Sequence, residues 1–148
     1  MKTLVLGIGN LLLKDEGVGI HAIRALEKET LPPDIDLLDG GTGGLHLLGR
    51  LQEYDRIILV DATLDHHPPG AIRHIRPRYA TDYPPLMSAH EIGLRDMIEA
   101  MILCGHHPEV DLLVVSAGDI GELGVELSPA VEASLPEIIR RIRLLIRN

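Results

Sequence analysis

Apolar and polar residues along this chain form short blocks that predict strands and helices in alternation. Four apolar runs are nearly continuous, which is typical of strands buried on both faces of a parallel sheet. They occupy residues 3–8, 35–38, 57–60 and 112–115. A fifth run, 71–76, alternates apolar with polar residues after a proline–glycine turn, so we expect a half-exposed edge strand there.

Apolar residues at helical spacing follow these strands. Helices are expected after residue 17, over 45–51, beyond residue 91 and over a closing segment that ends near residue 146. Ser88 and Glu91 have the spacing of a capping box at the start of the third helix. The closing helix has two possible starts, at Ser128-Pro129 or at 134–137, because both carry a serine followed by a proline. The whole pattern predicts one domain, 1–148, folded as a three-layer α/β sandwich with a twisted, mostly parallel five-stranded sheet flanked by helices.

Composition restricts the core and the partners. Hydrophobic residues make up 45% of the chain and Phe and Trp are absent, so we expect an aliphatic core. The formal net charge of −8 repels phosphate backbones and argues against nucleic-acid binding. No segment approaches the ~20 apolar residues of a membrane span. The first apolar run is too short for a signal peptide, and we expect a soluble, cytoplasmic protein.

Cys104 is the single cysteine, which excludes a disulfide framework and a thiolate metal cluster. A reactive thiol needs a positive and partly exposed setting, whereas 101–103 is Met-Ile-Leu. We therefore expect Cys104 to be a small buried apolar residue on a helix.

Polar residues stand at the ends of the predicted parallel strands, where such sheets carry their functional sites. These residues are Asn10, Asp39, Asp61 and Ser116. The glycine turn at 7–10 is not a dinucleotide loop, because Leu12 occupies the place of the third glycine. Carboxylates at 15 and 16 would also repel a pyrophosphate.

Glu16, Asp61 and His90 form a candidate metal site with two oxygen ligands and one imidazole. His90 is expected in the first turn of its helix, where the macrodipole disfavours imidazolium and so favours the metal-binding neutral form. Each residue also has an ordinary explanation: Glu16 can cap a helix, Asp61 can accept backbone amides, and His90 can be solvated. Ser116 is not in a Gly-x-Ser-x-Gly nucleophile elbow, which argues against a serine hydrolase.

Five motifs in order along nearly the whole chain resemble those of the hydrogenase maturation proteases. The matching segments are Gly7-Ile8-Gly9-Asn10 with 13–19, Asp39-Gly40-Gly41-Thr42, Val60-Asp61-Ala62 with Pro69-Gly70, Ser88 with His90 and Leu94, and Leu127-Ser128-Pro129. This resemblance implies a twisted sheet between helices and an endopeptidase that cuts once near the C-terminus of a nickel-iron hydrogenase large-subunit precursor. It also implies that nickel has been inserted before the cut.

The resemblance further implies that Glu16, Asp61 and His90 bind a metal ion and that Asp39 lies in the glycine-rich motif that borders the cleft. The nickel would come with the substrate, and zinc or cadmium could substitute for it. Two schemes stay open: a metal on the trio activates water, or the metal only marks the substrate while Asp39 acts as general base.

Two other functions are compatible with the same residues. One is a non-catalytic nickel-binding accessory protein of hydrogenase assembly that uses the same trio. The other is a small-molecule hydrolase or nucleosidase, which the shortage of aromatic residues for base stacking disfavours, since the chain has three Tyr only.

Overall fold

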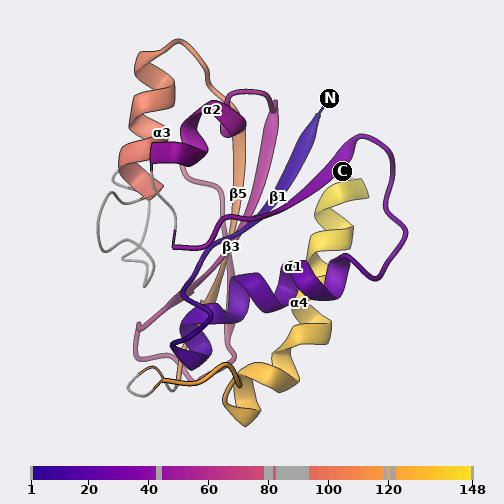
Figure 1. Ribbon diagram of the computed structural model, residues 1–148, viewed down its shortest axis with the longest axis vertical. Helices are drawn as coiled ribbons and strands as arrows, with labels where there is room; N and C mark the ends of the chain where they lie inside the picture. The colour runs from indigo at the N-terminus through magenta and orange to yellow at the C-terminus, as the bar shows by residue number, and fades with distance from the viewer. Residues whose placement is uncertain are drawn as a thin grey trace.

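The computed structural model describes residues 2–42, 45–78, 82, 94–118, 120 and 123–147. Five strands form one sheet in the order β2-β1-β3-β5-β4 (Figure 1). Their bounds are β1 Thr3–Gly7, β2 Ile35–Asp39, β3 Arg56–Thr63, β4 Ile72–Ile75 and β5 Glu109–Ser116. Only β4 runs antiparallel, paired with β5 at the edge. The predicted mostly parallel five-stranded sheet and its edge strand are confirmed.

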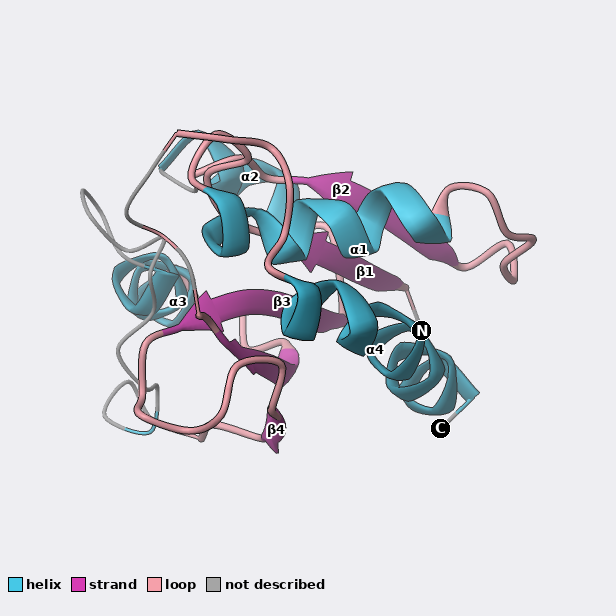
Figure 2. Ribbon diagram, turned by 90° about the horizontal axis from the view of Figure 1, so that it is seen from below, coloured by secondary structure: helices cyan, strands magenta, loops and turns pink. Residues whose placement is uncertain are grey.

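Helices cover both faces of the sheet. Their bounds are η1 Lys14–Gly17, α1 Val18–Leu26, η2 Leu45–Leu47, α2 Leu48–Leu51, α3 Leu94–Leu103 and α4 Pro129–Arg147. Helices α1 and α4 lie side by side on one face, while α2 and α3 pack on the other (Figures 1 and 2). The three-layer sandwich expected from the alternating pattern is therefore confirmed.

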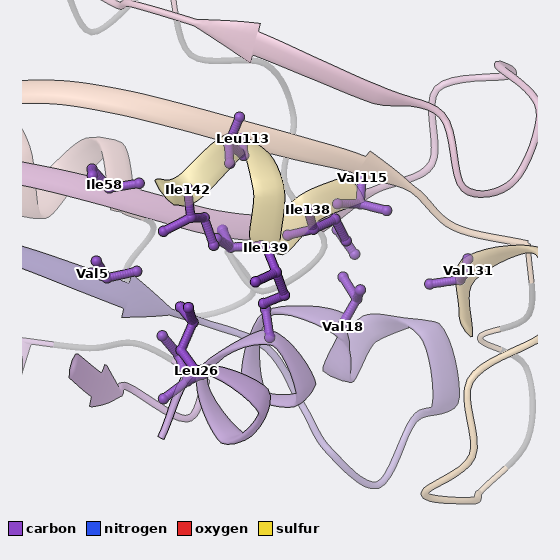
Figure 3. Close-up of a cluster of buried hydrophobic side chains, with 14 of the residues drawn as sticks. Val5, Val18, Leu26, Ile58, Leu113, Val115, Val131, Ile138, Ile139 and Ile142 are labelled. Atoms are coloured by element: carbon purple, nitrogen blue, oxygen red, sulfur yellow. The ribbon is translucent and has the colours of Figure 1, made fainter. Parts of the chain in front are cut away.

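Alternate residues of each strand supply two separate cores. On the side of α1 and α4, strand residues such as Val5, Ile58 and Leu113 pack against Ile138 and Ile142 (Figure 3). The opposite face of the same strands packs on α2 and α3. The cores are aliphatic as expected, apart from the buried Tyr54, whose hydroxyl donates to Asp36 at 2.6 Å.

The closing helix starts at the earlier of the two predicted sites. Pro129 occupies its first position, where the missing amide hydrogen costs nothing. Pro136 lies inside the helix and removes one backbone hydrogen bond. Val131, Ile138 and Ile142 are fully buried on both sides of this proline, so burial of the apolar face keeps the helix continuous. The capping box at Ser88 lies outside the described residues.

The expectation that Cys104 is buried was wrong, because the side chain is exposed. Helix α3 stops at Leu103, and the amides of Gly105 and His106 donate to the carbonyls of Ile102 and Met101. This pattern is a Schellman motif, with Gly105 in the left-handed conformation that glycine favours (φ 86°). Cys104 is thus the last residue before the turn and projects beyond the packed face.

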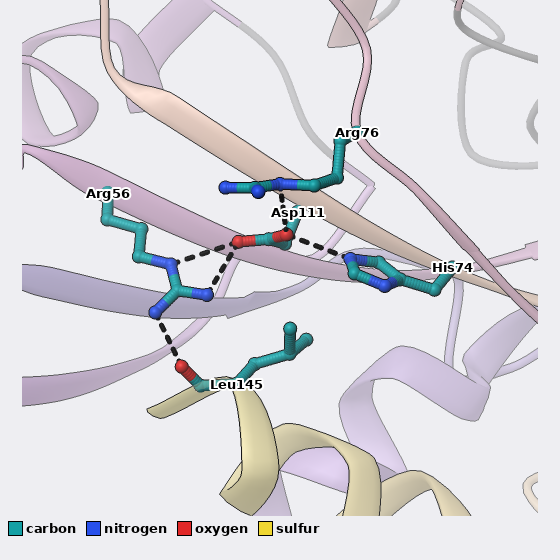
Figure 4. A network of polar contacts seen from close by, with 5 residues as sticks. All are labelled: Arg56, His74, Arg76, Asp111 and Leu145. Atoms are coloured by element: carbon teal, nitrogen blue, oxygen red, sulfur yellow. Dashed lines mark hydrogen bonds and ion pairs between the residues drawn. The ribbon is translucent and has the colours of Figure 1, made fainter. Parts of the chain in front are cut away.

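A buried carboxylate links four elements at the amino end of the parallel strands. Asp111 on β5 accepts hydrogen bonds from Arg56 Nε at 2.9 Å and Nη2 at 2.7 Å, and its other oxygen lies 2.8 Å from His74 Nε2 (Figure 4). Arg76 Nε lies 3.0 Å from the same oxygen. Arg56 also donates to the carbonyl of Leu145 near the end of α4. The network therefore fastens the last turn of α4 to β3, β5 and β4.

Charge pairing stabilises the ionised form of Asp111. Burial by itself would raise the pKa, but hydrogen bonds from Arg56 and His74 and the charges of Arg56 and Arg76 outweigh it and lower the pKa below its ordinary value. A buried carboxylate of this kind stabilises the fold only while its cationic partners remain.

Asp111→Asn is expected to lower the free energy of unfolding by about 3 kcal/mol, because it leaves the buried Arg56 guanidinium without its counter-charge. Urea unfolding measures the change. The control is Glu137→Gln, which breaks exposed ion pairs with Arg140 and Arg141 on α4 and should have a much smaller effect. Equal losses in the two variants would contradict a special role for Asp111.

The contribution of Asp111 should depend on pH in a defined direction. Since the pKa is lowered in the folded state, the stabilisation is present above the unfolded-state value of ~3.9 and is lost as pH falls through the folded value. The difference in unfolding free energy between wild type and Asp111→Asn should therefore be constant near neutral pH and shrink below about pH 4. A difference that grows on acidification would contradict this sign.

Candidate functional site

The strand order reverses between β1 and β3, which makes their carboxyl ends the switch point of the sheet. From β1 the chain passes to β2 on one side, whereas β3 and β5 build the other side. Gly7, the last residue of β1, is level with Asp39 on β2 and Val60 on β3. In open α/β sheets ligands bind in the crevice outside such a point.

The glycines of the first motif bring backbones together at this point. A Cβ on Gly19 would lie 2.4 Å from the carbonyl oxygen of Val60, and one on Gly7 would lie 2.2 Å from the carbonyl oxygen of Gly19. A Cβ on Gly9 would meet the carbonyl oxygen of Glu16 at 2.0 Å. The motif thus seats the first turn of α1 directly on the ends of β1 and β3.

Asp15 has a structural role that sequence reasoning did not assign. Its side chain is fully buried and accepts hydrogen bonds from the amide of Gly118 at 2.8 Å and from the amide and hydroxyl of Ser128, both at 2.7 Å. One carboxylate therefore joins η1 to the loop after β5 and to the residue that precedes α4. Asp15 and Ser128 belong to two different motifs more than a hundred residues apart, so no sequence pattern indicates that they pair.

Glu16 and Asp61 are both buried at the carboxyl edge. Glu16 is 2% exposed and lies in η1, which packs against β3, while Asp61 is 0% exposed and lies on β3 itself. Asp61 Oδ1 accepts the amide of Ala62 at 2.8 Å. Burying two carboxylates is costly unless they are paired, hydrogen-bonded or bound to a metal. His90 lies outside the described residues, so the convergence of all three remains a prediction.

Asp39 lies at the same edge but is exposed. It is the last residue of β2, and its Oδ1 accepts the amide of Gly41 at 2.9 Å in a tight turn. The amide of Gly9 donates to the carbonyl of Gly41 at 2.6 Å, and this holds the turn against the end of β1. Two strand spacings separate β2 from β3, so the backbones of Asp39 and Asp61 are about 10 Å apart.

Ser116 is engaged in structure rather than poised as a nucleophile. It is buried, and its hydroxyl donates to Asp65 Oδ1 at 2.8 Å. Asp65 also lies 2.8 Å from Arg73 Nη2 and 3.2 Å from His67 Nδ1. Burial would raise the pKa of Asp65, but the bonds from Ser116 and His67 outweigh it and lower the pKa. Ser116 is thus held by Asp65, in agreement with the prediction that it is not the nucleophile of a serine hydrolase.

Comparison with known proteins decides the family. A family model described as hydrogenase maturation protease matches residues 20–143. The chain belongs to this family. The hydrogenase 2 maturation protease of Escherichia coli K12 is 34% identical over 154 aligned residues, covering 100% of this chain and 92% of that protein. HupD, a hydrogenase expression/formation protein of Bradyrhizobium diazoefficiens, is 37% identical over 88% of this chain and 70% of its own length.

Solved structures of maturation proteases have the same fold. The hydrogenase maturating endopeptidase HybD of E. coli superposes with a TM-score of 0.91 at 33% identity, covering 99% of this chain and 93% of that one. HybD of Thermococcus kodakarensis gives 0.81 at 29% identity, covering 99% of each chain. This maturation protease is accordingly a hydrolase that acts on peptide bonds, and neither a non-catalytic accessory protein nor a nucleosidase. Within the described part of the chain, no helix is long and apolar enough to span a bilayer.

The maturation protease also has a cavity of about 440 Å³ far from the carboxyl edge. It lies beside the first residues of β5 and the end of α3, and its walls include Arg76, Ile98, Glu99, His107 and Glu109. Acidic and basic side chains are mixed there, and none of the motif carboxylates lines it. The switch point, where the motif carboxylates lie, therefore remains the candidate site.

Asp39→Asn should keep the fold and sharply reduce proteolytic processing. Asn retains an oxygen that can accept the amide of Gly41, so the turn survives while the negative charge is lost. Loss of a general base costs about 10²–10⁴ in rate. The measurements are the urea midpoint and the cleavage rate. Asp15→Asn is the contrasting variant and should lower the midpoint, because it disturbs three hydrogen bonds. Wild-type cleavage by Asp39→Asn would remove Asp39 from the mechanism.

Proposed function

We propose that this maturation protease removes the C-terminal extension of a nickel-iron hydrogenase large-subunit precursor after nickel insertion. The observation that carries the proposal is the burial of Glu16 and Asp61 at the switch point of a chain in this family. Two carboxylates kept out of water suit a cationic metal centre far better than they suit a neutral peptide.

The donor set fits a divalent transition metal. Glu16 and Asp61 offer carboxylate oxygens from neighbouring segments, and His90 would add an imidazole nitrogen. Three protein ligands leave coordination positions open for ligands from a partner. In the proposed role the metal is the nickel carried by the substrate, and zinc or cadmium can occupy the same ligands in its place.

Asp39 supplies the chemistry in the scheme that we favour. Its exposed carboxylate takes a proton from a water molecule as that water attacks the scissile carbonyl carbon. The tetrahedral intermediate then expels the amide nitrogen, which receives the proton, so that one water is consumed and one peptide bond is broken. The backbones of Asp39 and Asp61 are about 10 Å apart, so in this scheme nickel binds beside Asp61 while the peptide bond is cut beside Asp39.

The competing scheme places a resident metal on Glu16, Asp61 and His90, where it would lower the pKa of bound water and polarise the carbonyl. In this scheme the precursor need not carry nickel. The two schemes therefore differ in whether nickel in the precursor is needed for cleavage.

Nickel-loaded precursor should be cleaved, and the nickel-free form should be cleaved little or not at all. The buried carboxyl groups of Glu16 and Asp61 favour a substrate that presents a cation. His90→Ala should weaken recognition of the loaded form, because it removes the one nitrogen ligand. The assay is a side-by-side digestion of both precursor forms by wild type and variant, followed by the mobility of the large subunit on a gel.

Two additions serve as controls. A chelator that does not extract nickel from the precursor should leave cleavage intact, and added zinc should not rescue the nickel-free form. Equal cleavage of the two forms would contradict the recognition scheme and support the resident-metal scheme instead.

A further inference from the structure

Among the residues that the structure describes, four large apolar side chains are exposed in the loops at the carboxyl edge. They are Leu12 at 58%, Leu64 at 57%, Leu123 at 81% and Val125 at 52% exposed. We call these four residues the apolar rim. Soluble proteins often expose single leucines, but several exposed apolar residues in the loops along one edge of a sheet are candidates for an interaction site.

The backbone beneath the apolar rim is held in place. The amide of Gly124 donates to the carbonyl of Leu12 at 2.8 Å, and the amide of Lys14 donates to the carbonyl of Gly124 at 2.9 Å. His21 Nε2 on α1 lies 3.0 Å from the carbonyl oxygen of Val125. Loops that come from opposite ends of the chain thus form a short parallel bridge between Leu13 and Gly124.

Two residues of the apolar rim lie close in sequence to the two buried carboxylates. Leu12 stands in the loop that leads from β1 into η1, four residues before Glu16. Leu64 follows the last residue of β3, three residues after Asp61. Exposed apolar residues therefore stand in the loops that adjoin the segments carrying Glu16 and Asp61, at the edge where the proposed cleavage takes place.

We infer that the apolar rim binds an apolar stretch of the precursor's C-terminal extension and so positions the scissile bond; this inference rests on the proposed function. An endopeptidase must hold the polypeptide next to the bond that it cuts, and an uncharged rim binds uncharged side chains with least desolvation. A second copy of this chain fits less well. Four side chains cover far less than the ~800 Å² per partner that a standard stable interface buries.

The test is a kinetic comparison with nickel-loaded precursor as the probe. The double variant Leu12→Gln/Leu123→Gln should raise KM about tenfold while kcat changes less than about twofold, because the rim contributes binding and takes no part in bond cleavage. Leu64→Gln, in the loop after β3, should raise KM on its own. The matched controls are Leu103→Gln and Leu144→Gln, which alter exposed leucines on α3 and α4 and should leave KM unchanged.

Each outcome bears on the inference. The rise in KM should persist in high salt, since apolar contacts are not screened by ions. An unchanged KM in the double variant and in Leu64→Gln would overturn it. A wild-type dimer that dissociates in the double variant, seen by sedimentation, would assign the rim to self-association and also overturn it. Failure of the wild-type protein to cleave the precursor would instead reject the proposed function, so the two failures are distinguishable.

Discussion

The first turn of α1 rests on the backbone of β1 and β3, and the rest of the candidate site depends on that contact. Gly19 meets the carbonyl of Val60 where any Cβ would clash, and Gly9 meets the carbonyl of Glu16 in the same way. The close approach carries η1 onto the carboxyl edge of β3 and brings Glu16 to the strand that holds Asp61. Larger residues at these positions would push η1 away from the end of β3.

Two buried aspartates, at opposite ends of the sheet, maintain this arrangement. Asp15 ties η1 to Ser128 and Gly118, and so fixes the loop that presents Glu16. Asp111 ties the last turn of α4 to the strands through Arg56. Both carboxylates are fully partnered in hydrogen bonds or ion pairs, which is the condition under which a buried charge stabilises a fold. Asp39 differs from both, because its carboxylate is exposed to water at the carboxyl edge of the sheet.

Strand positions, sheet class and the layer arrangement were predictable from sequence because each depends on local hydrophobic periodicity. The site was predictable only in part. Strand ends pointed to Asp39 and Asp61, since carboxyl ends of parallel strands meet at one edge. The structural role of Asp15 was not predictable, because its partner Ser128 lies more than a hundred residues away and periodicity carries no information on such pairs.

The exposure of Cys104 was also not predictable from hydrophobic periodicity, here because of a local turn and not because of a distant partner. Its neighbours are apolar, and helical spacing alone would continue the buried face through it. The Schellman turn at Gly105 ends the helix first, and one residue of difference in the position of a helix end moves a side chain from the core to the surface.

The central claim is that Glu16, Asp61 and His90 contact nickel carried by the precursor. Nickel K-edge X-ray absorption tests it most directly. The spectrum of the loaded precursor is measured alone and in complex with the Asp39→Asn protein, which is expected to cleave slowly. Our account predicts that the complex adds oxygen and nitrogen ligands to the nickel, and that these ligands are lost when Asp61→Asn is combined with Asp39→Asn. A nickel spectrum that stays the same in a stable complex would contradict the account.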